Sequence, residues 1–178
     1  MQKTIKQHLK IVPLKFNSRD FLKEIGMYLQ DILPVSCAVG DPLPVPHQAF
    51  HTERAQFNST AVLNAVYPSI KSPGMVLVVA DSDLYSSGLN FVFGEADIRR
   101  GIAIISLARL HQSFYGLKEN PELLFTRTLK EAVHETGHLF RMGHCTNHRC
   151  VMHFSNSLSD TDTKDFRFCS NCSKYFQM

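Results

Sequence analysis

The stretch HETGHLFRMGH, residues 134–144, holds two histidines four positions apart, His134 and His138, with Glu135 directly after the first. On a helix this spacing places both imidazoles on one face, about one turn apart, where both rings can reach one Zn²⁺ at roughly 2.0 to 2.1 Å. Glu135 is then rotated by about 100° from His134, so its carboxylate flanks the metal rather than binding it. A carboxylate in that position accepts a proton from a metal-bound water. We therefore predict that His134 and His138 are metal ligands and that Glu135 is a general base.

The residues before this stretch predict the helix that the spacing needs. Asn120 is a favourable N-cap, Pro121 occupies the first helical position, where proline is harmless, and Glu122 adds negative charge to the first turn. Apolar residues then recur at helical intervals up to Phe140. We expect a helix over about residues 121–140 that carries the two histidines.

A third ligand must come from beyond this helix. No glutamate follows the one in the motif, which excludes the class of enzymes in which a later glutamate completes the site. His144 lies six residues past His138, and on a continued helix it would lie about 9 Å along the axis and face away from the metal. The helix must therefore end between them, and Gly143 is a residue that could end it. We expect His144 as the third ligand, with His148, His153 and several aspartates as weaker candidates.

Four cysteines in the last 34 residues form two close pairs, Cys145-x4-Cys150 and Cys169-x2-Cys172, whereas Cys37 stands alone upstream. This spacing is typical of a closed tetrahedral site in which four thiolates bind zinc. Two disulfides or reactive redox thiols are the alternatives. They fit less well because the amino terminus carries no export signal, and thiols stay reduced in the cytoplasm. We expect a structural zinc at the four cysteines and a buried hydrophobic side chain at Cys37.

His144 and Cys145 are neighbours that would serve different metals. Successive side chains of an extended segment point to opposite sides, so adjacent residues can bind two separate ions. One peptide bond then couples the two sites. We expect two Zn²⁺ per chain, one catalytic and one structural, with the structural ion fixing the carboxy-terminal tail and the position of His144.

These motifs resemble a known family. Residues 134–144 resemble the metzincin pattern H-E-x-x-H-x-x-G-x-x-H, and the continuation to residue 172 resembles the archaemetzincins. Further similarity lies in QFNST at 56–60, NFVFGEA at 90–96, CVM at 150–152 and FSNS at 154–157. The resemblance thus covers most of the chain.

The resemblance implies a fold and a chemistry. It implies an α+β zincin of the metzincin type, with a mixed β-sheet, packed helices that include the active-site helix, and a small carboxy-terminal subdomain stabilised by zinc. It also implies a zinc metallopeptidase, a methionine at Met152 in a turn beneath the catalytic zinc, and an archaeal source. The resemblance points to the four-cysteine zinc site as well.

One position departs from the family pattern. Arg141 stands where metzincins have the glycine that lets the chain turn sharply towards the third ligand, and a glycine follows two positions later at Gly143. An L-residue in a left-handed conformation is strained by about 1–2 kcal/mol. We expect the turn to be displaced to Gly143 together with strain at Arg141, and lost zinc binding is the alternative. The long cationic side chain of Arg141 could also block the site or select substrates.

The rest of the chain alternates strand-like and helix-like stretches, without a repeat or a linker that would divide it. We expect strands over 9–14, 35–39, 75–80, 90–93 and 101–107, with a charged connection between the last two, and helices over 19–33 and 60–66. The sequence therefore predicts one domain, residues 1–178, with an upper lobe over 1–143 and a lower lobe over 144–178 organised by the four-cysteine site.

Composition excludes several classes of protein. The chain has 178 residues, 44% apolar and 20% charged, which is ordinary for a globular domain and excludes disordered and fibrous classes. The formal net charge is +3 with scattered basic residues, so nucleic acid is not an expected partner. No apolar stretch approaches the roughly 20 residues that cross a bilayer, and residues 1–14 do not form a signal peptide. We expect a cytoplasmic protein without a membrane partner, and the sequence does not indicate its oligomeric state.

The leading hypothesis is a zinc metallopeptidase that hydrolyses a peptide or protein substrate. The first alternative is a catalytically weak or inactive relative that binds peptides or protein termini, with Arg141 filling the cleft. The second is a structural zinc module for partner binding. Residues 90–93 could form the edge strand that pairs with an extended peptide, although a strand without a ligand would look the same. The sequence does not separate internal from terminal cleavage.

Overall fold

The computed structural model describes residues 6–176. The described residues leave out 1–5 and 177–178. Both outer limits of the predicted domain therefore lie outside them, as does the start of the stretch 1–14 that we do not expect to be a signal peptide. The division into two lobes at residue 144 stays a prediction.

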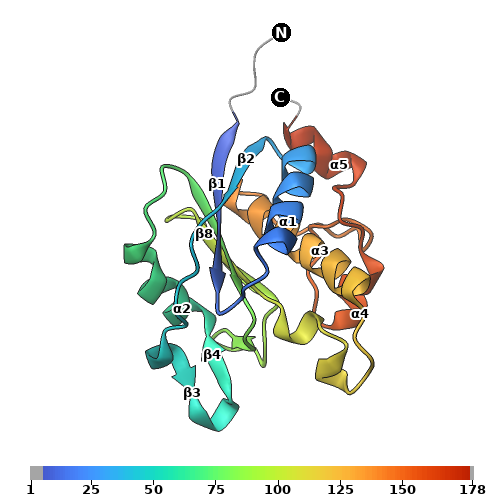
Figure 1. Ribbon diagram of the computed structural model, residues 1–178. Helices are drawn as coiled ribbons and strands as arrows, with labels where there is room; N and C mark the ends of the chain where they lie inside the picture. Colours follow the sequence, from blue (N-terminus) through green and yellow to red (C-terminus); the bar gives the residue numbers. More distant parts are fainter. Residues whose placement is uncertain (1–5, 177–178) are drawn as a thin grey trace.

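A five-stranded mixed sheet, in the order β2-β1-β5-β8-β7, forms the centre of the fold (Figure 1). Its strands are β1 (Gln7–Leu14), β2 (Val35–Val39), β5 (Met75–Ala80), β7 (Gly94–Asp97) and β8 (Ile102–Ser106). Strand β1 pairs in parallel with β2 and β5, and β5 pairs in parallel with β8. Strand β7 is antiparallel to β8 and forms one edge of the sheet.

A second, three-stranded sheet lies beside the first. It contains β3 (Phe50–His51), β4 (Gln56–Asn58) and β6 (Leu84–Tyr85). Strand β4 lies in the middle, antiparallel to β3 and parallel to β6. The carbonyl of Leu84 also accepts a hydrogen bond of 2.9 Å from the N–H of Val92, which ties this small sheet to the segment before β7.

The α-helices are α1 (Arg19–Ile32), α2 (Ser59–Val66), α3 (Pro121–Leu139), α4 (Leu158–Thr163) and α5 (Ser170–Ser173). Short 3-10 helices cover His47–Ala49, Thr52–Arg54, Tyr67–Ser69, Ala108–Leu110, Ser113–Tyr115 and Lys174–Phe176. Asn120 caps α3 as expected, and Asn58 caps α2; their side chains accept hydrogen bonds of 3.0 and 2.9 Å, respectively, from backbone N–H groups. Over residues 6–176, no helix combines the length and the apolar character needed to cross a bilayer.

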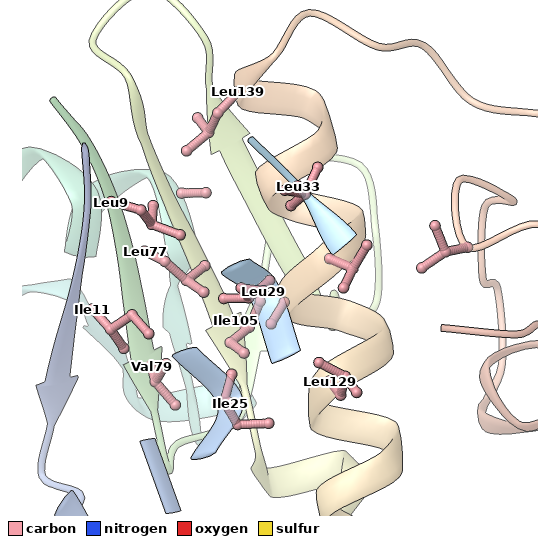
Figure 2. Close-up of a cluster of buried hydrophobic side chains, with 14 of the residues drawn as sticks. Leu9, Ile11, Ile25, Leu29, Leu33, Leu77, Val79, Ile105, Leu129 and Leu139 are labelled. Carbon is pink, nitrogen blue, oxygen red and sulfur yellow. The ribbon is translucent and has the colours of Figure 1, made fainter. Parts of the chain in front are cut away.

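Separate apolar clusters cover the two faces of the central sheet. Helices α1 and α3 pack on one face, where Leu9, Leu77 and Ile105 from β1, β5 and β8 face Leu29 and Leu129 of the helices (Figure 2). Helix α2 packs on the opposite face. The parallel strands are thus buried on both faces, which explains the continuous apolar run MVLVVA of β5. The sheet gives α3 a rigid support along one side.

The expected strand over 90–93 is wrong. The strand lies at Gly94–Asp97, inside the stretch whose charges favour a connection. Instead of joining the sheet, the Asn90 carbonyl accepts a hydrogen bond of 2.8 Å from the Arg54 guanidinium. Charge is tolerated in β7 because two hydroxyl groups at the start of α2 donate to the Glu95 carboxylate.

Charged side chains of α3 tie the following tail to this helix. Arg127 donates two hydrogen bonds of 2.7 Å to the Asp162 carboxylate, and the Lys130 ammonium donates to two carbonyls of α4. Lys164 has no exposed side-chain surface, and its Nζ lies 3.1 Å from Glu131 Oε1. Together with the buried tail residues Val151 and Met152, these contacts position the tail against α3.

We predict that Lys164→Met lowers the free energy of unfolding by about 3–5 kcal/mol, because the substitution leaves the Glu131 carboxylate buried without its partner. Chemical denaturation measures the change. The double variant Glu131→Gln/Lys164→Met removes both charges and should recover most of the loss. A single variant as stable as the wild type would contradict the buried ion pair.

Candidate active site

Three histidine side chains meet where α3 ends. His134 and His138 lie one turn apart on α3, with their Nε2 atoms 3.1 Å from each other. His144 follows the helix, and its ring centroid lies 5.4 Å from that of His134 and 4.8 Å from that of His138. One nitrogen of each ring lies within 4.8 Å of the other two. The structure thus brings together the three expected ligands, while His148 is exposed and lies outside the group.

Backbone carbonyls orient two of these rings. The Nδ1 of His134 donates to the carbonyl of Val151 at 2.7 Å, and the Nδ1 of His138 donates to that of Met142 at 2.8 Å. Each Nε2 is then the unprotonated nitrogen of a neutral ring. Burial lowers the pKa of His134 well below its ordinary value, and burial also lowers the pKa of His138 and of His144. Unprotonated nitrogens so close repel each other unless a cation lies between them, so this donor set fits Zn²⁺.

Arg141 makes the turn that returns His144 to the other rings. Helix α3 ends at Leu139, and Arg141 has a φ of 67°, in the left-handed region. Its N–H donates to the carbonyl of His138 at 2.8 Å. The φ angle of Gly143 is not positive. The expected displacement of the turn to Gly143 is therefore wrong, and Arg141 carries the strain of about 1–2 kcal/mol.

The Arg141 side chain does not reach the site. It is exposed and lines a separate cavity with Met142 and Tyr175. Neither of the two cavities that the histidines border includes it. The expectation that this cation blocks the site or selects substrates there is wrong.

Glu135 lies between the histidines and the edge strand β7. Its side chain borders a cavity of about 190 Å³ together with His134, and a second cavity of about 280 Å³ that all three histidines line. Gly94 of β7 makes room for it, since a Cβ there would lie 2.5 Å from Glu135 Oε1. Burial raises the pKa of Glu135 well above its ordinary value. The carboxyl group therefore sits beside the histidines in surroundings that let it hold a proton.

The four carboxy-terminal cysteines, Cys145, Cys150, Cys169 and Cys172, converge as well. Their four Sγ atoms lie within 4.8 Å of one another, and those of Cys145 and Cys169 are 3.9 Å apart. That separation is close to the sulfur–sulfur edge of about 3.8 Å in a tetrahedron with Zn–S bonds near 2.3 Å. Backbone N–H groups of Cys172 and Asn171 lower the pKa of the Cys169 thiol to about 6, which favours the thiolate, whereas burial raises the pKa of the Cys150 and Cys172 thiols. No disulfide links these cysteines, and the donor set fits zinc.

The loop between the two clusters connects them through its main chain. The N–H of Cys145 donates to the carbonyl of Met152 at 2.9 Å, and the Nδ1 of His153 donates to the carbonyl of Cys145 at 3.0 Å. His153 therefore orders the loop and lies outside the group of three histidines. Met152 is fully buried against α3, where a Cβ on Gly137 would lie 2.5 Å from its sulfur. This agrees with the expected position of the methionine under the helix that carries the histidines.

Sequence reasoning missed the charged groups that lie behind the histidines. Glu131 precedes Glu135 by one helical turn and is buried, and its Oε1 accepts a hydrogen bond of 3.0 Å from Thr161 as well as contacting Lys164. Positions 131, 134, 135 and 138 form a polar stripe at helical spacing, and this signal could have identified Glu131. Lys164 has no comparable signal, because its partner is far away in the sequence.

Comparisons with known protein sequences agree on one family. Residues 48–178 match the family model of peptidase family M54. An archaemetzincin from Methanocaldococcus jannaschii is 44% identical over 164 residues, which are 92% of this chain and 85% of that protein. An archaemetzincin from Thermococcus kodakarensis is 39% identical over 171 residues, which are 92% of each chain.

Solved structures share the fold. The crystal structure of an archaemetzincin from Methanopyrus kandleri has a TM-score of 0.84 at 31% identity, and the match covers 99% of this chain and 96% of that one. A zinc-dependent peptidase from Methanocorpusculum labreanum has a TM-score of 0.80 at 30% identity, with 95% and 99% covered. The expected α+β fold of the metzincin type is confirmed. The chain therefore belongs to peptidase family M54, the archaemetzincins, and is a zinc metallopeptidase.

Proposed function

We propose that the three histidines, His134, His138 and His144, hold the catalytic Zn²⁺ of this metallopeptidase. Glu135 is the general base for the hydrolysis of a peptide bond. The observation that carries the proposal is the convergence of three neutral imidazoles beside one buried carboxyl group. When bound, zinc would lower the pKa of a coordinated water and polarise the scissile carbonyl.

Glu135 moves the proton in both halves of the reaction. Its carboxylate accepts a proton from the attacking water and then gives it to the nitrogen of the leaving amine. Glu135 borders both cavities at the histidines, so one carboxyl group can serve both proton transfers. Gly94 supports this role, since only a residue without a side chain lets β7 approach the carboxylate so closely.

The edge strand β7 offers a place for the main chain of a peptide substrate. It is the outermost strand of the sheet, and Gly94 brings it directly to Glu135. An extended peptide that pairs with this edge gains affinity from main-chain hydrogen bonds. The peptide-pairing edge is thus Gly94–Asp97, in place of the segment 90–93.

We also propose that a second Zn²⁺, bound by the four cysteines, organises residues 144–178 as the lower lobe. Its closed set of four sulfur ligands suits a structural ion. Since Cys145 directly follows His144, the order that this ion imposes on the tail also holds the third histidine. Nothing favours an inactive relative with Arg141 in the cleft, because Arg141 borders neither cavity at the histidines.

We predict that Glu135→Gln lowers kcat/KM for peptide hydrolysis by at least about 100-fold, because glutamine has the same size but cannot accept the proton. Zinc content, measured by atomic absorption, should stay at two ions per chain. Glu122→Gln, which removes an exposed carboxylate from the first turn of the same helix, is the matched control. Unchanged hydrolysis by Glu135→Gln would contradict its role as the base.

A second substitution tests how the carboxylate is positioned. Gly94→Ala places a methyl group against Glu135, so we expect kcat/KM to fall by about tenfold or more while the zinc content stays unchanged. In the control Gly143→Ala, the added Cβ meets no atom within 4 Å, and activity should stay within about twofold of the wild type. Equal activity of the two variants would argue against the close approach of β7.

A further inference from the structure

The smaller cavity beside Glu135 is lined by both apolar and polar residues. Its volume is about 190 Å³, and its walls include Leu89, Phe91 and Phe154. Glu131 and Ser155 also line it, although neither takes part in the proposed catalysis. A side chain with an apolar body would lie against the walls, and its tip would meet these two polar residues.

Glu131 has one carboxylate oxygen committed and one available. Its Oε1 accepts a hydrogen bond from Thr161 and lies 3.1 Å from Lys164 Nζ. Within residues 6–176, Oε2 takes part in none of the hydrogen bonds of Glu131. A ligand in the cavity can therefore donate a hydrogen bond to this carboxylate without displacing Lys164.

Ser155 supplies a second polar group that needs a partner. Its hydroxyl is buried, and within the described range it makes no hydrogen bond. A buried polar group without a partner carries a desolvation cost of about 1–3 kcal/mol, so the hydroxyl gains if it turns into the cavity that Ser155 lines and meets a ligand there. The hydroxyl can both donate and accept, which suits a ligand that does the same.

The charge of Lys164 decides which donor fits. A cationic tip at Oε2 would share one carboxylate with the Lys164 ammonium, and the two positive charges would repel each other. A neutral donor meets no such repulsion. The cavity therefore suits a hydroxyl or an amide better than a lysine or arginine side chain.

We propose that this cavity is a specificity subsite, and that it selects a substrate residue next to the scissile bond whose side chain has an apolar body and a neutral hydrogen-bond donor at its tip. Tyrosine is the best candidate, because it combines an aromatic ring, suited to a cavity lined by Phe91 and Phe154, with a hydroxyl that can hydrogen-bond to Glu131 and Ser155. This inference rests on the proposed peptidase function and specifies its substrate. A site built to bind a hydroxyl discriminates strongly against an analogue that lacks it.

The test compares tyrosine with phenylalanine by binding. The probes are tetrapeptides blocked at both ends, with alanine at three positions and tyrosine, phenylalanine or lysine at one of the two central positions. Calorimetry with zinc-loaded Glu135→Gln, which retains bound peptide, gives the dissociation constants. We expect tyrosine to bind about tenfold more tightly than phenylalanine at one central position, and lysine to bind less tightly than tyrosine.

Variants of Glu131 and Ser155 assign the preference to this cavity. In the Glu135→Gln background, Ser155→Ala and the pair Glu131→Gln/Lys164→Met should each reduce the tyrosine preference to about threefold or less. Thr136→Val is the matched control, because it also removes a buried hydroxyl without a partner but lies outside the cavity. The control should keep the tenfold preference.

The outcomes separate this inference from the proposed function. Equal affinity for tyrosine and phenylalanine, tightest binding of lysine, or no saturable binding overturns the subsite. A wild-type protein that hydrolyses none of these peptides or a mixed peptide library contradicts the proposed function, whatever the binding ratio.

Discussion

Three imidazoles can surround one ion here only if the chain turns back between His138 and His144. A straight helix would carry the third ring about 9 Å further along the axis and away from the other two. Arg141 makes the turn in a left-handed conformation, and the carbonyl of Met142 directly after it orients His138. The turn thus brings His144 to the other rings, and the Met142 carbonyl within it fixes the tautomer of His138. Strain at Arg141 persists because the contacts on both sides of the turn determine its conformation.

The tail is held by polar contacts to α3 as well as by apolar residues, such as Val151 and Met152, that join the main core. Arg127, Lys130 and Glu131 on α3 each hold a partner in the segment that follows the histidines. Two of the four cysteines precede these contacts in the sequence and two follow them. Because His144 directly precedes Cys145, the contacts that position this segment also position His144 relative to α3.

Local sequence signals predicted most of the elements and the residues that come together in the two clusters. The caps at Asn58 and Asn120 form, α3 begins at Pro121, and the expected histidines and cysteines each come together. What failed depends on distant partners. Strand β7 was missed because the hydroxyls that hydrogen-bond to Glu95 lie on α2, far away in the sequence. The Lys164 ion pair was missed because it also joins residues far apart in sequence. The turn was misplaced because glycine is the usual left-handed residue, whereas here an arginine adopts this conformation.

An anomalous difference map, recorded at the zinc absorption edge from crystals of the zinc-loaded protein, tests the metal sites most directly. The account predicts one peak about 2.0 to 2.1 Å from the Nε2 atoms of His134, His138 and a nitrogen of His144, and a second about 2.3 Å from the four cysteine sulfurs. A map with a peak at the cysteines alone, or with His144 turned away from the first peak, would contradict it.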